Sequence, residues 1–260
     1  MSDKLILIIG QIMPKNCSSQ SLEDDVLKLA RSVAESGKPI GLPFNAVSAD
    51  ISSPQPMCDT AGRPFAETIF RWIDPNFEYW KDRMFALRST LVHATRTCAE
   101  PFYYSKGKVM SWRRNEALVA ATNPEQYAAA NIGAAIISPV HLPGGAIGAV
   151  VWASDKEIDL ADAFAANAAN LHALALRFVA TYHDARDLGP QGPAVYLTRR
   201  EIQCLKWAAA GKTDAEIATI MHISVPTVRF HITNSATKLG VTGKARAIQR
   251  ASTLGYIGHE

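Results

Sequence analysis

The side chains with the most specific chemistry lie between residues 224 and 239, where hydrogen-bonding groups recur on one side of an expected helix. Val225, Val228, Ile232, Ala236 and Leu239 follow a 3-4 spacing, which places them together as a packing stripe. The opposite side and its flank carry groups suited to base edges in a major groove: Thr227, Arg229, Phe230, Thr233, Asn234 and Thr237. An ordinary surface helix has the same two-sided pattern, so the interpretation depends on what surrounds it.

Three closely spaced helix starts surround this pattern. Thr198 with Glu201, and Thr213 with Glu216, have the S/T-x-x-E spacing of a capping box. Ser224 can cap the third helix, whose first turn contains a proline. Three short helices, the last one amphipathic, predict a helix-turn-helix that reads double-stranded DNA.

The charge distribution supports DNA as the partner. Residues 196–260 contain nine Lys and Arg against four acids, which leaves 18 bases and 20 acids in the first 195 residues. A basic module therefore follows a slightly acidic body, and basic side chains favour contact with phosphates. The expected phosphate contacts are Lys206, Lys212, Lys238, Lys244 and Arg246.

Residues 197–257 resemble the DNA-binding domain of LuxR-type transcription regulators. The motifs that carry the resemblance are Leu-Thr-x-Arg-Glu from Leu197, Gly-Lys-Thr-x-x-Glu-Ile-Ala from Gly211, Thr-Val-x-x-His from Thr227 and Lys-Leu-Gly from Lys238. The resemblance implies a homodimer on an inverted repeat, with RNA polymerase as a further partner. Residues 158–182 and a closing helix at 244–254, with a face of Ala245, Ile248 and Ala251, match the regions that pair subunits in the family.

Composition excludes several other classes of protein. The chain is 48% apolar and 20% charged, which is typical of globular domains. Four scattered cysteines form no C-x-x-C pair, so neither a metal nor another cofactor is expected. No signal peptide and no apolar run of about 20 residues is evident, which predicts a cytoplasmic protein without membrane contact.

The body before the basic module reads as a mixture of helices and strands. Residues 134–141 and 146–153 predict a hairpin, and residues 22–36, 67–96 (with a break near 74–75) and 158–182 predict helices. A segment rich in Gly and Pro predicts a linker at 186–195. We therefore expect an α+β protein, with an α/β/α sandwich at 1–185 and a four-helix domain at 196–260.

The body also resembles the signal-binding domain of LuxR-type regulators, whose Trp, Tyr and Asp bind an acyl-homoserine lactone. Aligned from Pro101 backward, Asn76 takes the Trp position, Trp80 the Tyr position, and Ser89-Thr90 the place of Asp-Pro. Val151 stands where a Ser or Thr is frequent. A serine in place of the aspartate removes a charged acceptor worth roughly 1.5–3 kcal/mol. The resemblance therefore implies a different ligand.

Clustered aromatic residues predict a cavity for a small apolar or aromatic molecule. The expected aromatic lining is Trp72, Trp80, Phe85, Phe102, Tyr103, Tyr104, Trp112 and Trp152. Ser89, Thr90 and Tyr103 are the polar groups expected near the ligand. Aromatic residues are usually core, and that interpretation stays open for each of them.

Three alternatives remain beside the ligand-responsive regulator. One is a LuxR-type regulator that needs no ligand. Another is a phosphorylation-driven response regulator, which is disfavoured because Gln11 and not an acidic pair follows the apolar run at residues 5–9. The third is an enzyme with an appended DNA-binding domain, but no nucleophile elbow, H-E-x-x-H motif or phosphate loop is found.

Overall fold

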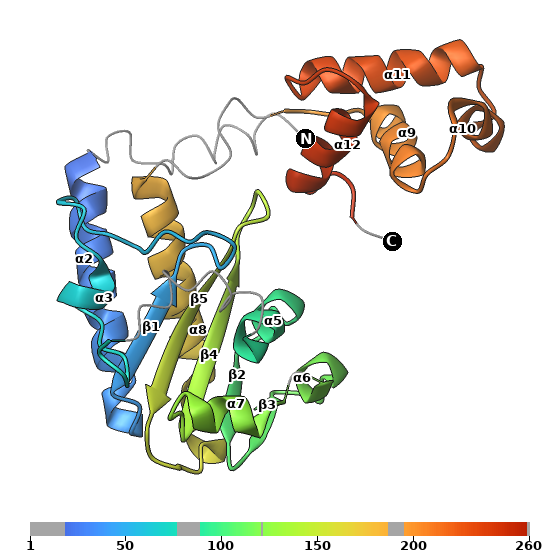
Figure 1. Ribbon diagram of the computed structural model, residues 1–260. Helices are drawn as coiled ribbons and strands as arrows, with labels where there is room; N and C mark the ends of the chain where they lie inside the picture. The colour runs from blue at the N-terminus through green and yellow to red at the C-terminus, as the bar shows by residue number, and fades with distance from the viewer. Residues whose placement is uncertain (1–18, 77–88, 121, 187–194, 259–260) are drawn as a thin grey trace, which may run out of the picture. The chain divides into compact units, whose positions relative to one another are not determined.

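The computed structural model describes residues 19–76, 89–120, 122–186 and 195–258. These residues form two compact units. The N-terminal unit contains the elements from α2 to α8, and the C-terminal unit contains α9 to α12 (Figure 1). Most of the predicted linker at 186–195 falls outside the described residues.

A five-stranded antiparallel sheet forms the middle layer of the N-terminal unit, in the order β1-β5-β4-β2-β3. Its strands are β1 (Phe44–Ser48), β2 (Phe102–Ser105), β3 (Lys108–Ser111), β4 (Ala134–His141) and β5 (Ile147–Ser154). The predicted hairpin of residues 134–153 is confirmed, and it forms two of the three inner strands, β5 and β4. Successive side chains of a strand point to opposite faces, so each strand supplies two separate cores.

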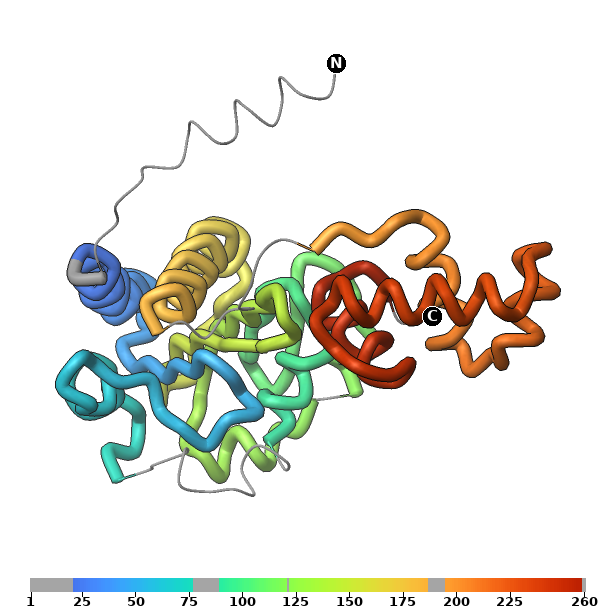
Figure 2. Tube along the Cα trace, turned by 90° about the horizontal axis from the view of Figure 1, so that it is seen from above, coloured from blue at the N-terminus to red at the C-terminus, as the bar shows by residue number. Residues whose placement is uncertain are grey.

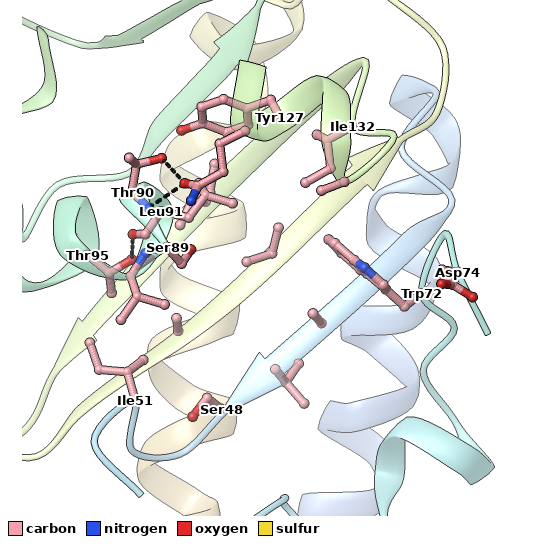
Figure 3. Close-up of a pocket in the computed structure, with 18 of the residues that line it drawn as sticks. Ser48, Ile51, Trp72, Asp74, Ser89, Thr90, Leu91, Thr95, Tyr127 and Ile132 are labelled. Atoms are coloured by element: carbon pink, nitrogen blue, oxygen red, sulfur yellow. Dashed lines mark hydrogen bonds between the residues drawn. The ribbon is translucent and has the colours of Figure 1, made fainter. Parts of the chain in front are cut away.

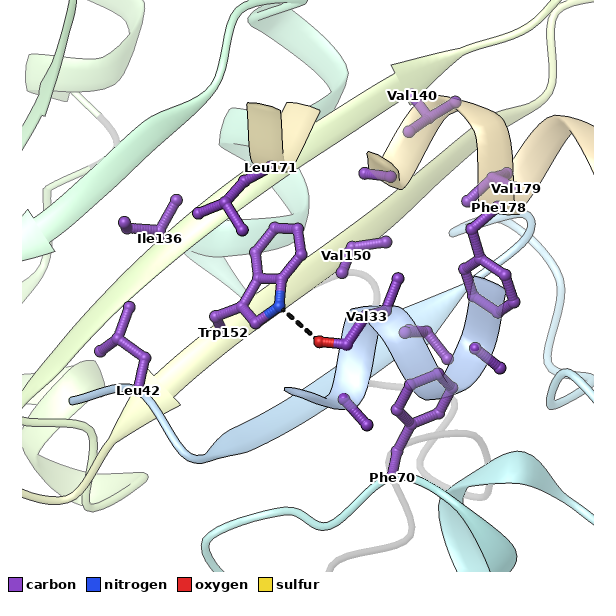
Figure 4. Packing of buried hydrophobic residues seen from close by; sticks show 14 of the residues in the cluster. Val33, Leu42, Phe70, Ile136, Val140, Val150, Trp152, Leu171, Phe178 and Val179 are labelled. Carbon is purple, nitrogen blue, oxygen red and sulfur yellow. Dashed lines mark hydrogen bonds between the residues drawn. The ribbon is translucent and has the colours of Figure 1, made fainter. Parts of the chain in front are cut away.

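Two long helices, α2 (Ser19–Ser36) and α8 (Ala161–Ala185), pack beside each other and cover one face of the sheet (Figures 1 and 2). Trp152 is fully buried in this layer, and its indole Nε1 donates to the carbonyl of Val33 at 2.9 Å (Figure 4). That bond lets a large aromatic residue be buried without an unpaired N–H group. The predictions of helices at 22–36 and 158–182 are confirmed, with α8 shifted by three residues toward the C-terminus.

Shorter helices cover the opposite face of the sheet: α5 (Thr90–Thr97), α6 (Glu116–Ala120) and α7 (Pro124–Ala129). Phe102 and Tyr104 of β2 and Ile137 of β4 are buried there, while their strand neighbours Tyr103 and Ile136 are buried against α2 and α8. The predicted α/β/α sandwich is therefore present.

The prediction of a largely helical segment at 67–96 is confirmed only at its two ends. Helix α3 (Phe65–Thr68) includes its first two residues and α5 includes its last seven, but residues 69–76 contain no helix, and residues 77–88 lie outside the described structure. The carbonyl of Arg71 accepts a hydrogen bond from the N–H of Asn45 at 2.7 Å. At Arg71 the chain therefore runs beside the edge strand β1 and does not form the helix that its periodicity suggested.

The C-terminal unit consists of α9 (Arg199–Ala209), α10 (Asp214–Met221), α11 (Val225–Lys238) and α12 (Lys244–Thr253). Both predicted capping boxes are confirmed, since each threonine accepts from the N–H three residues on and each glutamate accepts from the threonine N–H. Ser224 caps α11 as predicted, with a proline in the first turn. These local signals set where each helix begins.

The apolar stripe of α11 packs into the C-terminal unit as predicted. Val228, Ile232, Ala236 and Leu239 are buried, and Val225 packs beside them. Across both units, no helix within the described residues combines the length and apolar character required to span a bilayer.

Candidate functional site

A cavity of about 470 Å³ lies in the N-terminal unit, on the face of the sheet that carries α5 and α7 (Figure 3). Strands β1, β4 and β5 form its floor, the two helices form one wall, and residues 51–55 with Trp72 form another. The walls are mostly apolar, with contributions from Ile51, Leu91, Ile132, Ile137 and Val151. A mainly apolar hollow of this volume matches the sites that hold small organic molecules.

The polar groups of the cavity gather at the start of α5. Ser89 is the N-cap residue of this helix, and its Oγ accepts from the N–H of Val92 at 3.4 Å. The backbone N–H and the hydroxyl of Thr90 both donate to Oε1 of Gln126, each at 2.7 Å. Tyr127 follows Gln126 on α7, and Figure 3 shows its hydroxyl directed toward the same corner as Thr90.

Four of the predicted ligand contacts line this cavity, namely Trp72, Ser89, Thr90 and Val151. Asn76 is exposed and does not line it. Trp80 and Phe85 lie outside the described residues.

Tyr103 and Trp112 were predicted beside the ligand, but they do not line the cavity. Tyr103 is buried on the α8 face, with its ring centroid 4.6 Å from that of Phe164. Trp112 also lies near Phe164, at 6.3 Å, and is half exposed. For Tyr103 the correction follows from strand geometry, because a position in β2 faces one side of the sheet and the next faces the other.

Three further aromatic residues proposed for the lining are core residues. Phe102 and Tyr104 are buried beside α5–α7 without lining the cavity, and Trp152 is buried on the α8 face. The sequence did not predict three other parts of the lining, namely Gln126, Tyr127 and the segment 51–55. The only local signal near Gln126 was Asn123-Pro124, a cap and a first-turn proline that mark the start of a short helix.

In the C-terminal unit, the outward side of α11 keeps its polar and aromatic groups accessible. Phe230 is 61% exposed, which is unusual for a phenylalanine on a domain surface. Thr233 and Thr237 are also exposed, and Asn234 is half-buried. Thr227 is half-buried, with its hydroxyl 2.7 Å from the capping Ser224 hydroxyl.

Asp214, the first residue of α10, ties α11 and α12 to that helix. Its two carboxylate oxygens accept from Arg229 Nε at 3.3 Å and from Lys244 Nζ at 3.1 Å. The hydrogen bond from Lys244 is the main reason that the pKa of Asp214 is lowered. The carboxylate thereby restricts the exposed guanidinium of Arg229 at the edge of the outward face.

A second acid, Glu201, holds the other end of α11. It is 3% exposed, completes the capping box of α9 and accepts from Lys238 Nζ at 2.9 Å. Burial would raise the pKa of Glu201, but the hydrogen bonds from Thr198 and Lys238 outweigh that effect and lower it.

Residues 195–251 match the family model described as bacterial regulatory proteins, luxR family. The C-terminal domain belongs to the LuxR family.

Relatives of known function share mainly this LuxR-family domain. The transcriptional activator protein VanR of Vibrio anguillarum is 52% identical over 65 residues, which is 25% of this chain and 27% of that protein. The transcriptional activator protein LuxR of Aliivibrio fischeri is 32% identical over 120 residues, 46% of this chain and 48% of that protein. The matches thus span about a quarter to a half of these relatives' lengths.

The solved structure of Escherichia coli SdiA is similar over a longer stretch. It is 20% identical, with a TM-score of 0.45, and the alignment covers 98% of each chain.

Among the cations predicted to contact phosphate, three have structural partners within the LuxR-family domain. Lys238 and Lys244 pair with buried or partly buried acids, and Lys212 lies 3.9 Å from a carboxylate oxygen of Glu216. Lys206 and Arg246 are exposed and form no ion pair with the described residues. Asp214 and Glu201 were missed as the acids that organise α11, because their partners lie 15 to 37 residues away along the chain.

The predicted pairing face on α12 of the LuxR-family domain needs correction. Ala251 is fully buried and therefore not available to a second subunit, while Ile248 packs into the same core and stays partly exposed. Of the three residues proposed, only Ala245 is exposed. The small side chains let α12 approach α9 and α11 closely within one chain.

Proposed function

We propose that this chain is a ligand-responsive transcription regulator. Residues 1–185 form the signal-binding domain, 186–195 the linker and 196–260 the DNA-binding domain. The observation that carries the proposal is the pairing of a LuxR-family domain with a unit that encloses a mainly apolar cavity of about 470 Å³.

On the DNA side, α11 is the recognition helix. Arg229, Phe230, Thr233, Asn234 and Thr237 face the major groove, where the arginine can read a guanine and the phenylalanine can contact a thymine methyl group. Thr227 lies at the N-terminal end of the same face. Of the five predicted phosphate contacts, Lys206 and Arg246 are the best supported, because they are exposed and form no ion pair with the described residues.

A dimer on an inverted repeat completes the model, because two-fold DNA sites reflect two-fold protein symmetry. With the α12 face largely occupied by its own core, the exposed side of α8 is the better supported pairing surface. Leu176 is 43% exposed there, among exposed alanines of the same helix.

A selection from random duplexes tests the DNA-binding function. We expect enrichment of a two-fold symmetric sequence, and Arg229→Ala should cost about 1–3 kcal/mol on it if the side chain reads a guanine. Arg113→Ala in the N-terminal unit, where that residue pairs with Glu100, is a matched control that should leave affinity unchanged. No enriched sequence, or equal effects of the two variants, would contradict the proposal.

On the ligand side, the cavity takes a small apolar or aromatic molecule other than an ordinary acyl-homoserine lactone. Ser89 lines the cavity at the position where the resemblance calls for an aspartate, and it serves as a helix cap. Val151 contributes only an aliphatic surface. Asp74 is the one carboxylate among the described lining residues, and it is exposed and accepts from the N–H of Asn76.

Thermal unfolding of the full chain with lactones, aromatic acids and fatty acids tests the ligand side. A ligand at a hundred times its dissociation constant should add about 2.7 kcal/mol. Val151→Trp, which fills the cavity, should abolish that gain. Strong stabilisation by a simple acyl-homoserine lactone would refute our interpretation of Ser89 and Val151. Sequence-specific DNA binding with no response to any ligand would favour a regulator that needs none.

A further inference from the structure

The hydroxyl of Tyr127 is the buried polar group of the cavity that the described protein leaves unpaired. The residue is 2% exposed and lines the cavity, and its Oη has no hydrogen-bond partner. Its ring is held in place by stacking on Tyr104, with centroids 3.8 Å apart and planes 7° from parallel. A fixed, buried and unpaired hydroxyl is costly in a folded protein and needs an explanation.

Neighbouring polar groups are already committed to one another. Thr90 gives its only hydroxyl proton to Gln126, and the Thr90 oxygen does not accept the proton of Tyr127. The Gln126 carbonyl oxygen accepts from both the N–H and the hydroxyl of Thr90, which uses its two lone pairs. The Thr90 hydroxyl lies close enough to temper the raised pKa of Tyr127 without completing a hydrogen bond. The phenolic proton is thus available to a molecule in the cavity.

The lining also restricts the charge of that molecule. No Lys, Arg or His is among the described residues that line the cavity, and the one charged lining residue is the exposed Asp74. A carboxylate buried against these described residues would lose its hydration without gaining a cationic partner from them, which is strongly unfavourable. A ketone, ester or amide carbonyl has no such cost and needs only one donor.

From these contacts, and resting on the proposed ligand-binding function, we infer that the cavity selects a neutral apolar molecule with a carbonyl acceptor, and that Tyr127 donates the hydrogen bond that binds it. Burial raises the pKa of Tyr127 to about 12, so the phenol keeps its proton at neutral pH. Tyr127 is then a specificity-determining residue on α7, an element distinct from the helix that carries Ser89.

Two pairs of probes test the inference on the full chain at neutral pH: decan-2-one with decanoic acid, and 4-phenylbutan-2-one with 4-phenylbutanoic acid. Calorimetric titration should show that at least one ketone binds and that its matched acid binds more weakly. Tyr127→Phe should weaken ketone binding roughly three- to tenfold, the effect of one neutral hydrogen bond. The ligand-free variant should melt at the same temperature or higher, since an unpaired buried hydroxyl is removed.

Tyr104→Phe is the matched control, because it deletes the same atom from the stacked ring that does not line the cavity. It should leave ketone binding unchanged. Unaltered ketone affinity in Tyr127→Phe, or an acid that binds as tightly as its ketone, would overturn the inference while leaving the ligand-binding function intact. If none of the four probes bound the wild-type chain, the inference would fail, while stabilisation by another molecule of the panel used for thermal unfolding would still support the ligand-binding function.

Discussion

Two glutamates with the same local role, Glu201 and Glu216, allow the contribution of a buried ion pair to be isolated. Each accepts a hydrogen bond from the N–H of the threonine that caps its helix, at 2.7 and 2.8 Å. Glu201 is 3% exposed and also binds Lys238 at 2.9 Å. The Glu216 side chain is 52% exposed and lies 3.9 Å from Lys212. Replacing each glutamate with alanine therefore removes the same cap but different tertiary contacts.

The expected costs of the two substitutions differ. Loss of a capping interaction costs about 1 kcal/mol in either helix. A hydrogen bond between charged groups contributes roughly 1.5–3 kcal/mol when buried, which we reduce to about 1–2 kcal/mol because Lys238 is partly exposed. We predict that Glu201→Ala lowers the free energy of unfolding of the C-terminal domain by about 2–3 kcal/mol, and Glu216→Ala by about 1 kcal/mol.

Hydrogen exchange of the amides in α9 and α11, measured on the full chain, reports the stability of this domain separately from the other unit. Glu201→Ala should also weaken DNA binding, because the C-terminal end of α11 loses its tie to α9. Equal losses of stability in the two variants would refute the role assigned to the Lys238 pair.

The ion pair between Glu201 and Lys238 also predicts that the stability of this domain depends on pH. Because the folded-state pKa of Glu201 lies below its ordinary value of 4.5, its stabilisation is complete above that pH and is lost as the pH falls through the lower folded value. Glu201→Gln should remove this part of the loss of stability at acid pH. If stability fell with pH in this variant as it does in the wild type, Glu201 would not be the group responsible.

Three further predictions concern other parts of the chain. Asp214→Asn should weaken DNA binding by about 1 kcal/mol, because the arginine on α11 loses its orienting carboxylate; an unchanged mobility-shift titration would contradict this. Burial, and then the nearby His141, lowers the pKa of His172 below its ordinary 6.5, so the wild type should lose stability as the pH falls below that value. His172→Asn should flatten this dependence in thermal unfolding, and a slope equal to that of the wild type would exclude His172 as its source. Gly148→Ala should cost about 1–3 kcal/mol. Its β-carbon would lie 2.7 Å from a methyl group of Val179 and 2.8 Å from the carbonyl oxygen of Ser48, so an unaltered melting temperature would mean that both α8 and β1 can shift at no cost.

The C-terminal domain could be predicted almost completely from the sequence because its signals are local. The threonine caps of α9 and α10 and the serine cap of α11 act within four residues, and the stripe of α11 repeats at helical spacing. The features of this domain that the sequence did not predict are contacts between helices that lie far apart along the chain. The pairing of Lys238 with Glu201 depends on how two helices cross, and the burial of Ala251 and Ile248 depends on how α12 packs against them.

In the N-terminal unit, the sequence determined which segments are strands and helices wherever the apolar pattern was long and regular, as in β4, β5 and α8. It did not determine which face of the sheet each side chain occupies. Tyr103 and Tyr104 are neighbours with similar chemistry, yet they belong to different cores. Strand alternation separates adjacent residues, but only the packing of helices decides what each face contains.

The cavity likewise combines features that the sequence predicted with features that only the tertiary structure decided. Composition indicated an apolar hollow, and the resemblance pointed to Ser89 and Val151, which line it. Gln126 and Tyr127 line the cavity beside them only because α7 folds over the sheet next to α5. The periodicity within either helix does not predict this contact. Helix starts and amphipathic faces follow from interactions between residues three or four apart, so the sequence alone specifies them. Which hydroxyl remains unpaired inside the cavity was decided by tertiary structure, because it depends on contacts between segments far apart in the chain.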